Sequence, residues 1–135
     1  EISDMGVRRL SFQSVTGSFV ASENSGNLFV IRGEITNDYP KSRSFILIKG
    51  SILDDKGQVV KRKLAYAGNN FKEEEIKSLP LEKINKAMKN RYGMGRKNVN
   101  VAPGVKIAFT IIFEDLPKNL SEFTVEAVSS SPGTK

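Results

Sequence analysis

Alternating apolar and polar residues predict β-strands along most of the chain. The clearest run covers residues 105–114 and is apolar at every second position. Its alternating apolar residues are Val105, Ile107, Phe109, Ile111 and Phe113. Because successive side chains of a strand point to opposite faces, this run places one face against a hydrophobic core.

Five more segments are short, rich in β-branched and aromatic residues, and bounded by turn residues. They cover residues 7–16, 27–36, 44–54, 58–67 and 121–129, and a shorter extra strand fits 17–21. The faces expected to share the core are Phe29, Ile31, Gly33 and Ile35 in the second segment, Ile46, Ile48, Gly50 and Ile52 in the third, and Phe123, Val125 and Ala127 in the last.

The segment 58–67 combines an apolar face with a cluster of charges. Val60, Leu64 and Tyr66 align on one face of it. The intervening run Lys61-Arg62-Lys63 favours an edge strand, because exposed charges there discourage the addition of foreign strands. Turn signals precede this segment at Asp54–Gly57 and precede the run 105–114 at Pro103-Gly104.

Residues 71–92 break the period of two. Four apolar residues here fall at helical intervals: Leu81, Ile84, Met88 and Tyr92. This spacing predicts a helix with a narrow apolar face, which begins after Pro80 and stops at Gly93. An earlier helical turn fits residues 73–79, and residues 93–98 predict a flexible, basic connection.

Together these elements predict an all-β fold, an immunoglobulin-like antiparallel β-sandwich with a helical insertion near residues 73–92. Hairpin turns join the strands, and no repeating β-α-β pattern occurs. The length of 135 residues fits one domain. We therefore expect a single domain over residues 1–135, with a flexible tail from about residue 130, where Ser, Pro and Gly prevail.

Composition removes most catalytic and metal chemistry. The chain has no Cys and no His, so it lacks the commonest general base and the usual soft metal ligands. The acidic cluster Glu73–Glu75 suits a helix N-terminus, and Asp54-Asp55 suits a turn. We expect no enzyme activity, no catalytic residue, no cofactor, no metal and no small-molecule substrate.

The one surface that suggests a partner is basic. The formal net charge is +6, and a stretch of fifteen residues carries six cations: Lys83, Lys86, Lys89, Arg91, Arg96 and Lys97. Such a surface suits acidic partners or phosphates, but stacking aromatics are sparse, so we do not expect nucleic acid. The alternative is a solvated helix face that keeps the protein soluble.

Several runs of residues are similar to one bacterial family. They are LFVIRGEITN (28–37), a loop with Pro40 and Arg43, ILIKGSILDDKGQVV (46–60), AYAGN (65–69) and NVAPGVKIAFTIIF (100–113). Their order and spacing resemble the domain of unknown function 3426 family over about residues 10–128. The family has no established activity, so no functional residue carries over.

The resemblance implies a location and a context. It implies an immunoglobulin-like domain on the periplasmic side of the inner membrane, tethered there by a transmembrane helix that follows a zinc ribbon. No apolar stretch here is long enough to span a bilayer, and the chain begins at Glu1 with its first Met at position 5. We therefore expect a piece of a longer protein, with the membrane anchor outside it.

Three functional hypotheses follow. The first is a non-enzymatic interaction domain that docks an unknown protein partner, either at a sheet edge or on the basic insertion. The second is a passive structural spacer. The third is a nucleic-acid-binding module that uses the basic segment 83–97.

Overall fold

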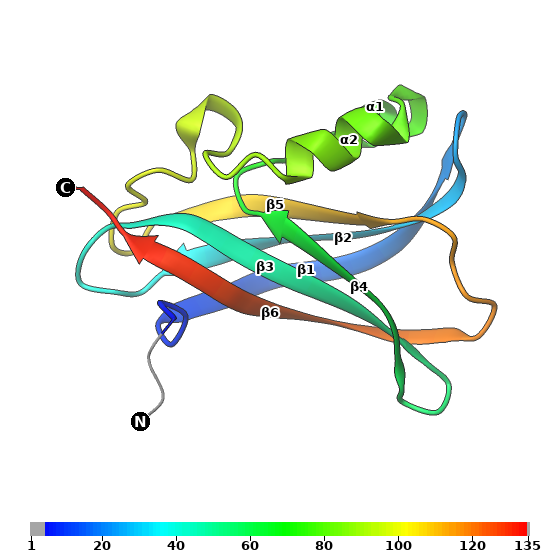
Figure 1. The fold of residues 1–135 in the computed structure, drawn as a ribbon, viewed down its shortest axis with the longest axis horizontal. Coiled ribbons are helices and arrows are strands. Elements are labelled where there is room, and N and C mark those ends of the chain that lie inside the picture. The colour runs from blue at the N-terminus through cyan, green and yellow to red at the C-terminus, as the bar shows by residue number, and fades with distance from the viewer. Residues whose placement is uncertain (1–4, 135) are drawn as a thin grey trace.

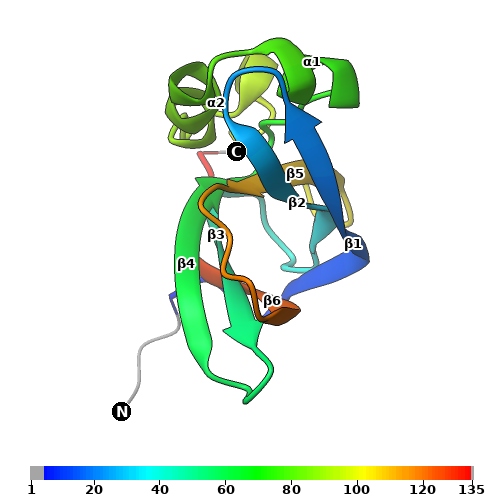
Figure 2. The same ribbon diagram turned by 90° about the vertical axis from the view of Figure 1, so that its right-hand side faces the viewer.

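The computed structural model describes residues 5–134 and contains two antiparallel three-stranded sheets that face each other (Figures 1 and 2). One sheet has the order β1-β2-β5, with bounds Leu10–Ser22, Gly26–Asn37 and Lys106–Phe113. The other has the order β4-β3-β6, with bounds Val59–Tyr66, Arg43–Asp54 and Leu120–Pro132. The predicted all-β antiparallel sandwich is confirmed.

The strand order is that of an immunoglobulin domain. If β1 to β6 are taken as strands A, B, C, C′, E and F, the two sheets read A-B-E and C′-C-F. Within residues 5–134, no strand occupies the place of strand G, which lies beside F in an immunoglobulin domain. The strand β6 therefore lies at an edge of its sheet.

The core lies between the two sheets, where the alternation of β2, β3 and β5 predicted it. Ile31, Ile48 and Phe109 are each 0% exposed, and Phe113 is 2% exposed. Each such side chain contributes about 1.5–3 kcal/mol to folding by leaving water. Val105 differs from its prediction, since it precedes β5 and is exposed.

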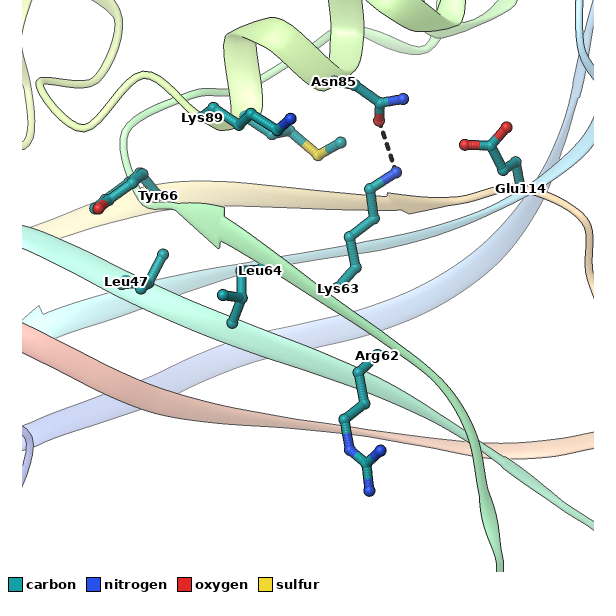
Figure 3. A pocket seen from close by; sticks show the side chains of 9 residues that line it. Leu47, Arg62, Lys63, Leu64, Tyr66, Asn85, Lys89 and Glu114 are labelled. Atoms are coloured by element: carbon teal, nitrogen blue, oxygen red, sulfur yellow. Dashed lines mark hydrogen bonds between the residues drawn. The ribbon is translucent and has the colours of Figure 1, made fainter.

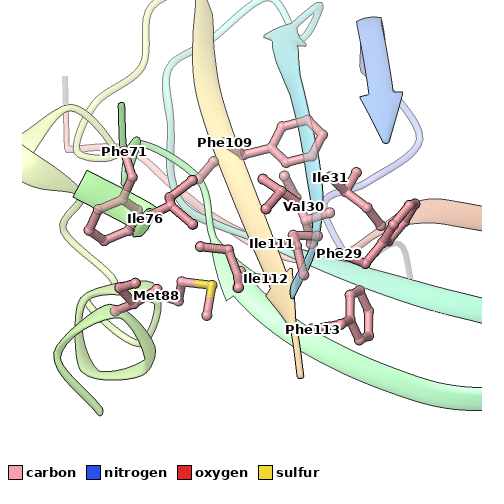
Figure 4. Packing of buried hydrophobic residues seen from close by; sticks show 14 of the residues in the cluster. Phe29, Val30, Ile31, Phe71, Ile76, Met88, Phe109, Ile111, Ile112 and Phe113 are labelled. Atoms are coloured by element: carbon pink, nitrogen blue, oxygen red, sulfur yellow. The ribbon is translucent and has the colours of Figure 1, made fainter. Parts of the chain in front are cut away.

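A helix pair forms a third layer over the outer face of the β1-β2-β5 sheet. It consists of α1 (Glu73–Ser78) and α2 (Leu81–Met88). Val30 and Ile112 point to this outer face and are nevertheless buried, as Figure 4 shows, with Ile76 and Met88 on the same side. The insertion is therefore part of the core, because it covers an apolar sheet face.

The main helix is shorter than its apolar spacing predicted. It ends at Met88, and Tyr92 lies beyond it and is 38% exposed. The N–H groups of Lys89 and Asn90 each bond three residues back, which tightens the last turn, and Asn90 Oδ1 accepts the N–H of Tyr92. Because Asn competes in this way for local main-chain groups, the helix stops before the last apolar position.

The aligned apolar residues of β4 face outward, although the sequence suggested that they face the core. Val60 and Leu64 are 43% and 51% exposed, whereas Lys61 and Lys63 lie on the inward side. Their amines reach polar groups at the rim: Lys61 Nζ donates to the Glu114 carbonyl, and Lys63 Nζ donates to Asn85 Oδ1 at 2.6 Å. Long lysine stems can thus line the inner side while their amines reach hydrogen-bond acceptors at the rim. The predicted position of this strand at a sheet edge is confirmed.

Two strands are longer than predicted. The strand β1 continues from the first segment through 17–21 as one unit, with a bulge between Gln13 and Thr16. The strand β6 extends to Pro132, and its last residues pair with Arg43 and Ser44 of β3. The expected flexible tail therefore begins inside a paired strand.

The basic connection 93–98 is an ordered turn. It contains a short 3-10 helix, η1 (Met94–Arg96), and ends at Asn98, which is fully buried. The Ile46 N–H donates to Asn98 Oδ1 at 2.9 Å, and Asn98 Nδ2 donates to the Ile46 carbonyl at 3.0 Å. The side-chain amide of Asn98 thus pairs with the start of β3 as a neighbouring strand would.

Replacing Asn98 should therefore destabilise the domain strongly. Asn98→Ala leaves the buried N–H of Ile46 without an acceptor, at a cost of about 2 kcal/mol or more in the free energy of unfolding. Asn98→Asp has the same shape but sets a carboxylate against the Ile46 carbonyl, so we expect a similar loss. Urea denaturation measures both.

A matched control is Asn119→Ala, since Asn119 is exposed and makes one long bond of 3.4 Å to Asp55. It should change the free energy of unfolding by less than about 0.5 kcal/mol. Equal stabilities of the Asn98 and Asn119 variants would contradict the structural role assigned to Asn98.

Candidate interaction site

The strand β4 and the helix α2 enclose an open cleft of about 570 Å³, here called the α2–β4 cleft. Its walls come from β3, β4, α2 and the residue after β5 (Figure 3). The lining residues are Leu47, Arg62, Lys63, Leu64, Tyr66, Asn85, Met88, Lys89 and Glu114.

One wall of the cleft is apolar because β4 turns its apolar face outward. Leu64 and Tyr66 alternate with inward residues along β4, and Tyr66 pairs in register with Leu47 of β3. Met88 contributes from the last turn of α2. An apolar surface with an adjoining polar rim is the common composition of a docking site.

The other feature of the cleft is its positive charge. Arg62, Lys63 and Lys89 line it, against a single carboxylate from Glu114. Figure 3 shows Lys63 between β4 and α2, with its amine toward Asn85. The pKa of Lys63 lies below its usual 10.5, first because burial penalises the charged amine and then because Lys61 and Lys89 repel it, while Glu114 opposes the shift.

The six predicted basic residues are all exposed, but the structure does not bring them onto one surface. Among them, Lys89 alone lines the α2–β4 cleft. Helical geometry sets Lys86 on the solvent side of α2 and Lys83 on the flank away from β4, because each residue turns by about 100°. Within residues 5–134, none of the lysines on α2 forms an ion pair.

Two of the six form a separate cluster with aromatic rings. The Arg91 guanidinium lies 5.0 Å from the ring centroids of both Phe45 and Tyr92, and Arg96 lies 5.4 Å from that of Tyr92. The guanidinium of Arg91 also donates to the phenol oxygen of Tyr92 at 3.0 Å. This hydrogen bond and the nearby charge lower the pKa of Tyr92.

Sequence reasoning missed Arg62, Lys63 and Leu64 as a site. It assigned Arg62 and Lys63 to the protection of an edge strand, and it aligned Leu64 with an apolar face. The signal that would have found them is the strict alternation from Val60 to Tyr66, which puts Arg62 and Leu64 on one face whichever side is buried.

Three further features of the described residues concern buried polar atoms, metal-ligating side chains and the length of the helices. Within residues 5–134, every buried side-chain nitrogen or oxygen has a hydrogen-bond partner, and no three acidic side chains gather as metal ligands. No helix in this part of the chain combines the length and apolar character needed to cross a membrane.

Comparison with known families assigns the chain. Residues 10–127 match the family described as protein of unknown function (DUF3426). The chain belongs to this family. The match covers β1 to β5, both helices and the first part of β6, so the sandwich and its helical insertion are a DUF3426 fold. Neither the curated proteins nor the solved structures include a match to this DUF3426 chain.

The lowered pKa of Lys63 predicts a pH dependence of stability. The unfolded chain binds a proton on this amine more tightly than the folded one, so the cost of burying the charge is fully present below the folded pKa. Stability should then rise with pH as the amine loses its proton, in a window that ends near 10.5.

The variant Lys63→Met keeps the aliphatic stem and removes the charge. Relative to this variant, the wild type should gain unfolding free energy as the pH rises from below the folded pKa of Lys63 toward 10.5. Urea denaturation at stepped pH measures the difference. The exposed Lys56→Met serves as the control, and an identical trend in the two variants would contradict the assignment.

Proposed function

We propose that this chain is a non-enzymatic interaction domain that binds an acidic segment of a protein partner in the α2–β4 cleft. The observation that carries the proposal is the composition of the cleft. Three cations and one carboxylate surround a wall made of Leu47, Leu64, Tyr66 and Met88. Such a site favours a ligand that presents carboxylates beside at least one apolar side chain.

Each part of the cleft has a distinct role in this binding. The apolar wall supplies affinity, because Leu64 is 51% exposed and loses contact with water when a ligand side chain covers it. Arg62 offers a planar fork that a carboxylate can accept in two bonds, and Lys89 adds a flexible point charge from the end of α2. The net charge of +6 attracts acidic segments from a distance.

The basic residues argue against nucleic acid as the ligand. A phosphate backbone needs a continuous track of cations, whereas five of the six predicted cations divide among the cleft, two further sides of α2 and the Arg91–Arg96 cluster. The nucleic-acid module and the passive spacer therefore remain the alternatives that the binding test distinguishes from this proposal.

Reversing charge inside the cleft should weaken binding of an acidic peptide. The probes are a fluorescein-labelled octapeptide, GELEGLEG, and its basic counterpart, GKLKGLKG. Fluorescence anisotropy should show binding of the acidic probe alone, and the double variant Arg62→Glu/Lys89→Glu should weaken it about tenfold or more at low salt.

The structure offers a matched control on the same helix. Lys86→Glu changes the charge by the same amount as Lys89→Glu alone, but on the solvent side of α2, and it should alter the affinity less than about twofold, whereas Lys89→Glu should weaken it more. Equal losses of affinity in Lys86→Glu and Lys89→Glu would mean that the overall charge, and not the cleft, determines binding. The nucleic-acid module would be favoured if an oligo-dT probe binds and charge reversal at Lys83, Lys86 or Lys89 weakens that binding equally. The passive spacer would be favoured if none of the probes binds.

The proposal includes a location outside the cytoplasm, tethered to the inner membrane through a part of the protein beyond this chain. Its support is the family, whose sequence pattern we associate with periplasmic domains. In spheroplasts that express the full-length gene product, protease added outside should degrade this domain and spare a cytoplasmic marker. Survival of the domain together with the marker would contradict the location.

A further inference from the structure

The alternation of hydrogen bonds fixes which main-chain groups of β6 face away from its sheet. The Ala67 N–H donates to the Ile46 carbonyl. The main-chain N–H and C=O groups of Ile46, and of every second residue after it in β3, therefore point toward β4. The main-chain groups of the residues between them, including Lys49, point toward β6, where Lys49 is in register with Glu126. The N–H and C=O groups of the alternate residues Phe123, Val125 and Ala127 therefore point outward, and we call this row the β6 edge.

The chain already uses one position further along the same side of β6. The bulge after Ala127 keeps the Ser130 N–H pointing away from β3, and it donates to the Met5 carbonyl at 3.0 Å. The Ser130 hydroxyl also donates to the Gly6 carbonyl. This contact shows that main chain from another segment fits beside this end of β6. It stops short of the β6 edge itself, which ends the sheet order of the described chain.

The core is less completely covered on this side of the sandwich than on the other. On the β4/β5 side, Ala65, Phe109 and Phe113 are almost fully buried, and the connection after β4 bonds to the edge of β5 through Gly68 and Ala108. On the β1/β6 side, the inward residues are all partly exposed. They include Leu10, Phe12, Val15 and Phe19 of β1, and Phe123, Val125 and Ala127 of β6.

We propose that the β6 edge binds an extended strand of a partner protein in the place that strand G takes in an immunoglobulin domain. A strand there would pair with the outward main-chain groups and cover the half-exposed side chains next to them. This surface is separate from the α2–β4 cleft and does not depend on it, because β3 lies between β4 and β6.

The side chains of β6 define the chemistry of that strand. On the outer face, Glu122 and Glu126 flank Thr124, and Glu126 also pairs with Lys49 Nζ at 2.9 Å. Because the side chain of Glu126 remains 62% exposed beside this ion pair, both carboxylates favour a partner strand with basic residues at alternate positions. On the inner face, Phe123 and Val125 call for apolar residues between them. A second copy of this chain fits poorly, since antiparallel pairing centred on Thr124 sets Glu122 of one copy opposite Glu126 of the other.

Amide hydrogen exchange of the isotope-labelled chain tests this binding. The probe is a peptide of alternating Val and Lys with Thr at both ends, and the control peptide has the same composition in scrambled order. The alternating peptide at millimolar concentration should slow exchange at Phe123, Val125 and Ala127 at least fivefold and leave Glu126 unchanged. Equal effects of the two peptides, or slowing that centres on β4, would overturn the proposal.

Charge variants provide a second measure that leaves the fold intact. Glu122→Lys should weaken binding of the alternating peptide about tenfold at low salt. Glu82→Lys, an equal change at an exposed position of α2, should leave that binding unaltered, as should the cleft variant Arg62→Glu/Lys89→Glu. Peptide binding that is insensitive to Glu122→Lys contradicts the proposal.

The oligomeric state and the amide exchange of the chain without peptide distinguish a partner strand from other occupants of the β6 edge. Dimerisation of the chain that protects the β6 edge would make a second copy the occupant and overturn the proposal. Protection of the same amides in the monomeric full-length gene product would mean that the protein fills the place with its own chain, which also overturns it. A monomer with fast exchange at the β6 edge in both forms is the expected result.

Discussion

The need to bury both faces of one sheet governs this structure. In most β-sandwiches, a sheet packs one face on the core and exposes the other. Here Leu28, Val30 and Ile112 make the outer face of β2 and β5 apolar as well, and their burial depends on the helix pair. A sandwich without the insertion would leave these side chains in water, so the insertion and the sheet form one folding unit.

The position of the helices determines where the molecule is open. The pair lies over the β1-β2-β5 sheet, and α2 contacts β4, so the α2–β4 cleft forms where the third layer meets the edge of the second sheet (Figure 1). The connection after β4 also closes the side of the sandwich next to β5. No comparable segment of the described chain covers β6 between Phe123 and Ala127, and the core is half-exposed there.

The sequence predicted those elements whose local pattern and tertiary role agree. The alternation around Phe109 identified β5, and the turn signals at Gly57 and Gly104 fell where the main chain has positive φ angles. The helical spacing at Ile84 and Met88 identified α2. In each case the same residues satisfy the period of the element and the packing of the core, so a single sequence was enough.

The site could not be predicted because it depends on exceptions to those patterns. On β4 the inward positions are Lys61 and Lys63, and hydrophobicity alone assigns them to the surface. They point inward because Asn85 and the Glu114 carbonyl stand within reach of their amines, a fact that only the tertiary structure supplies. The burial of Asn98 was hidden for the same reason, since its partner Ile46 lies 52 residues away.

Charge distinguishes the two edges of the β4-β3-β6 sheet from each other. The strand β4 carries Lys61, Arg62 and Lys63, whereas β6 carries Glu122 and Glu126. A basic strand is therefore repelled from β4 and attracted to β6, while an acidic segment is drawn to the cleft beside β4 and repelled from β6. The two proposed sites therefore suit ligands of opposite charge. Partners bound at them would not compete for one surface, because β3 lies between β4 and β6.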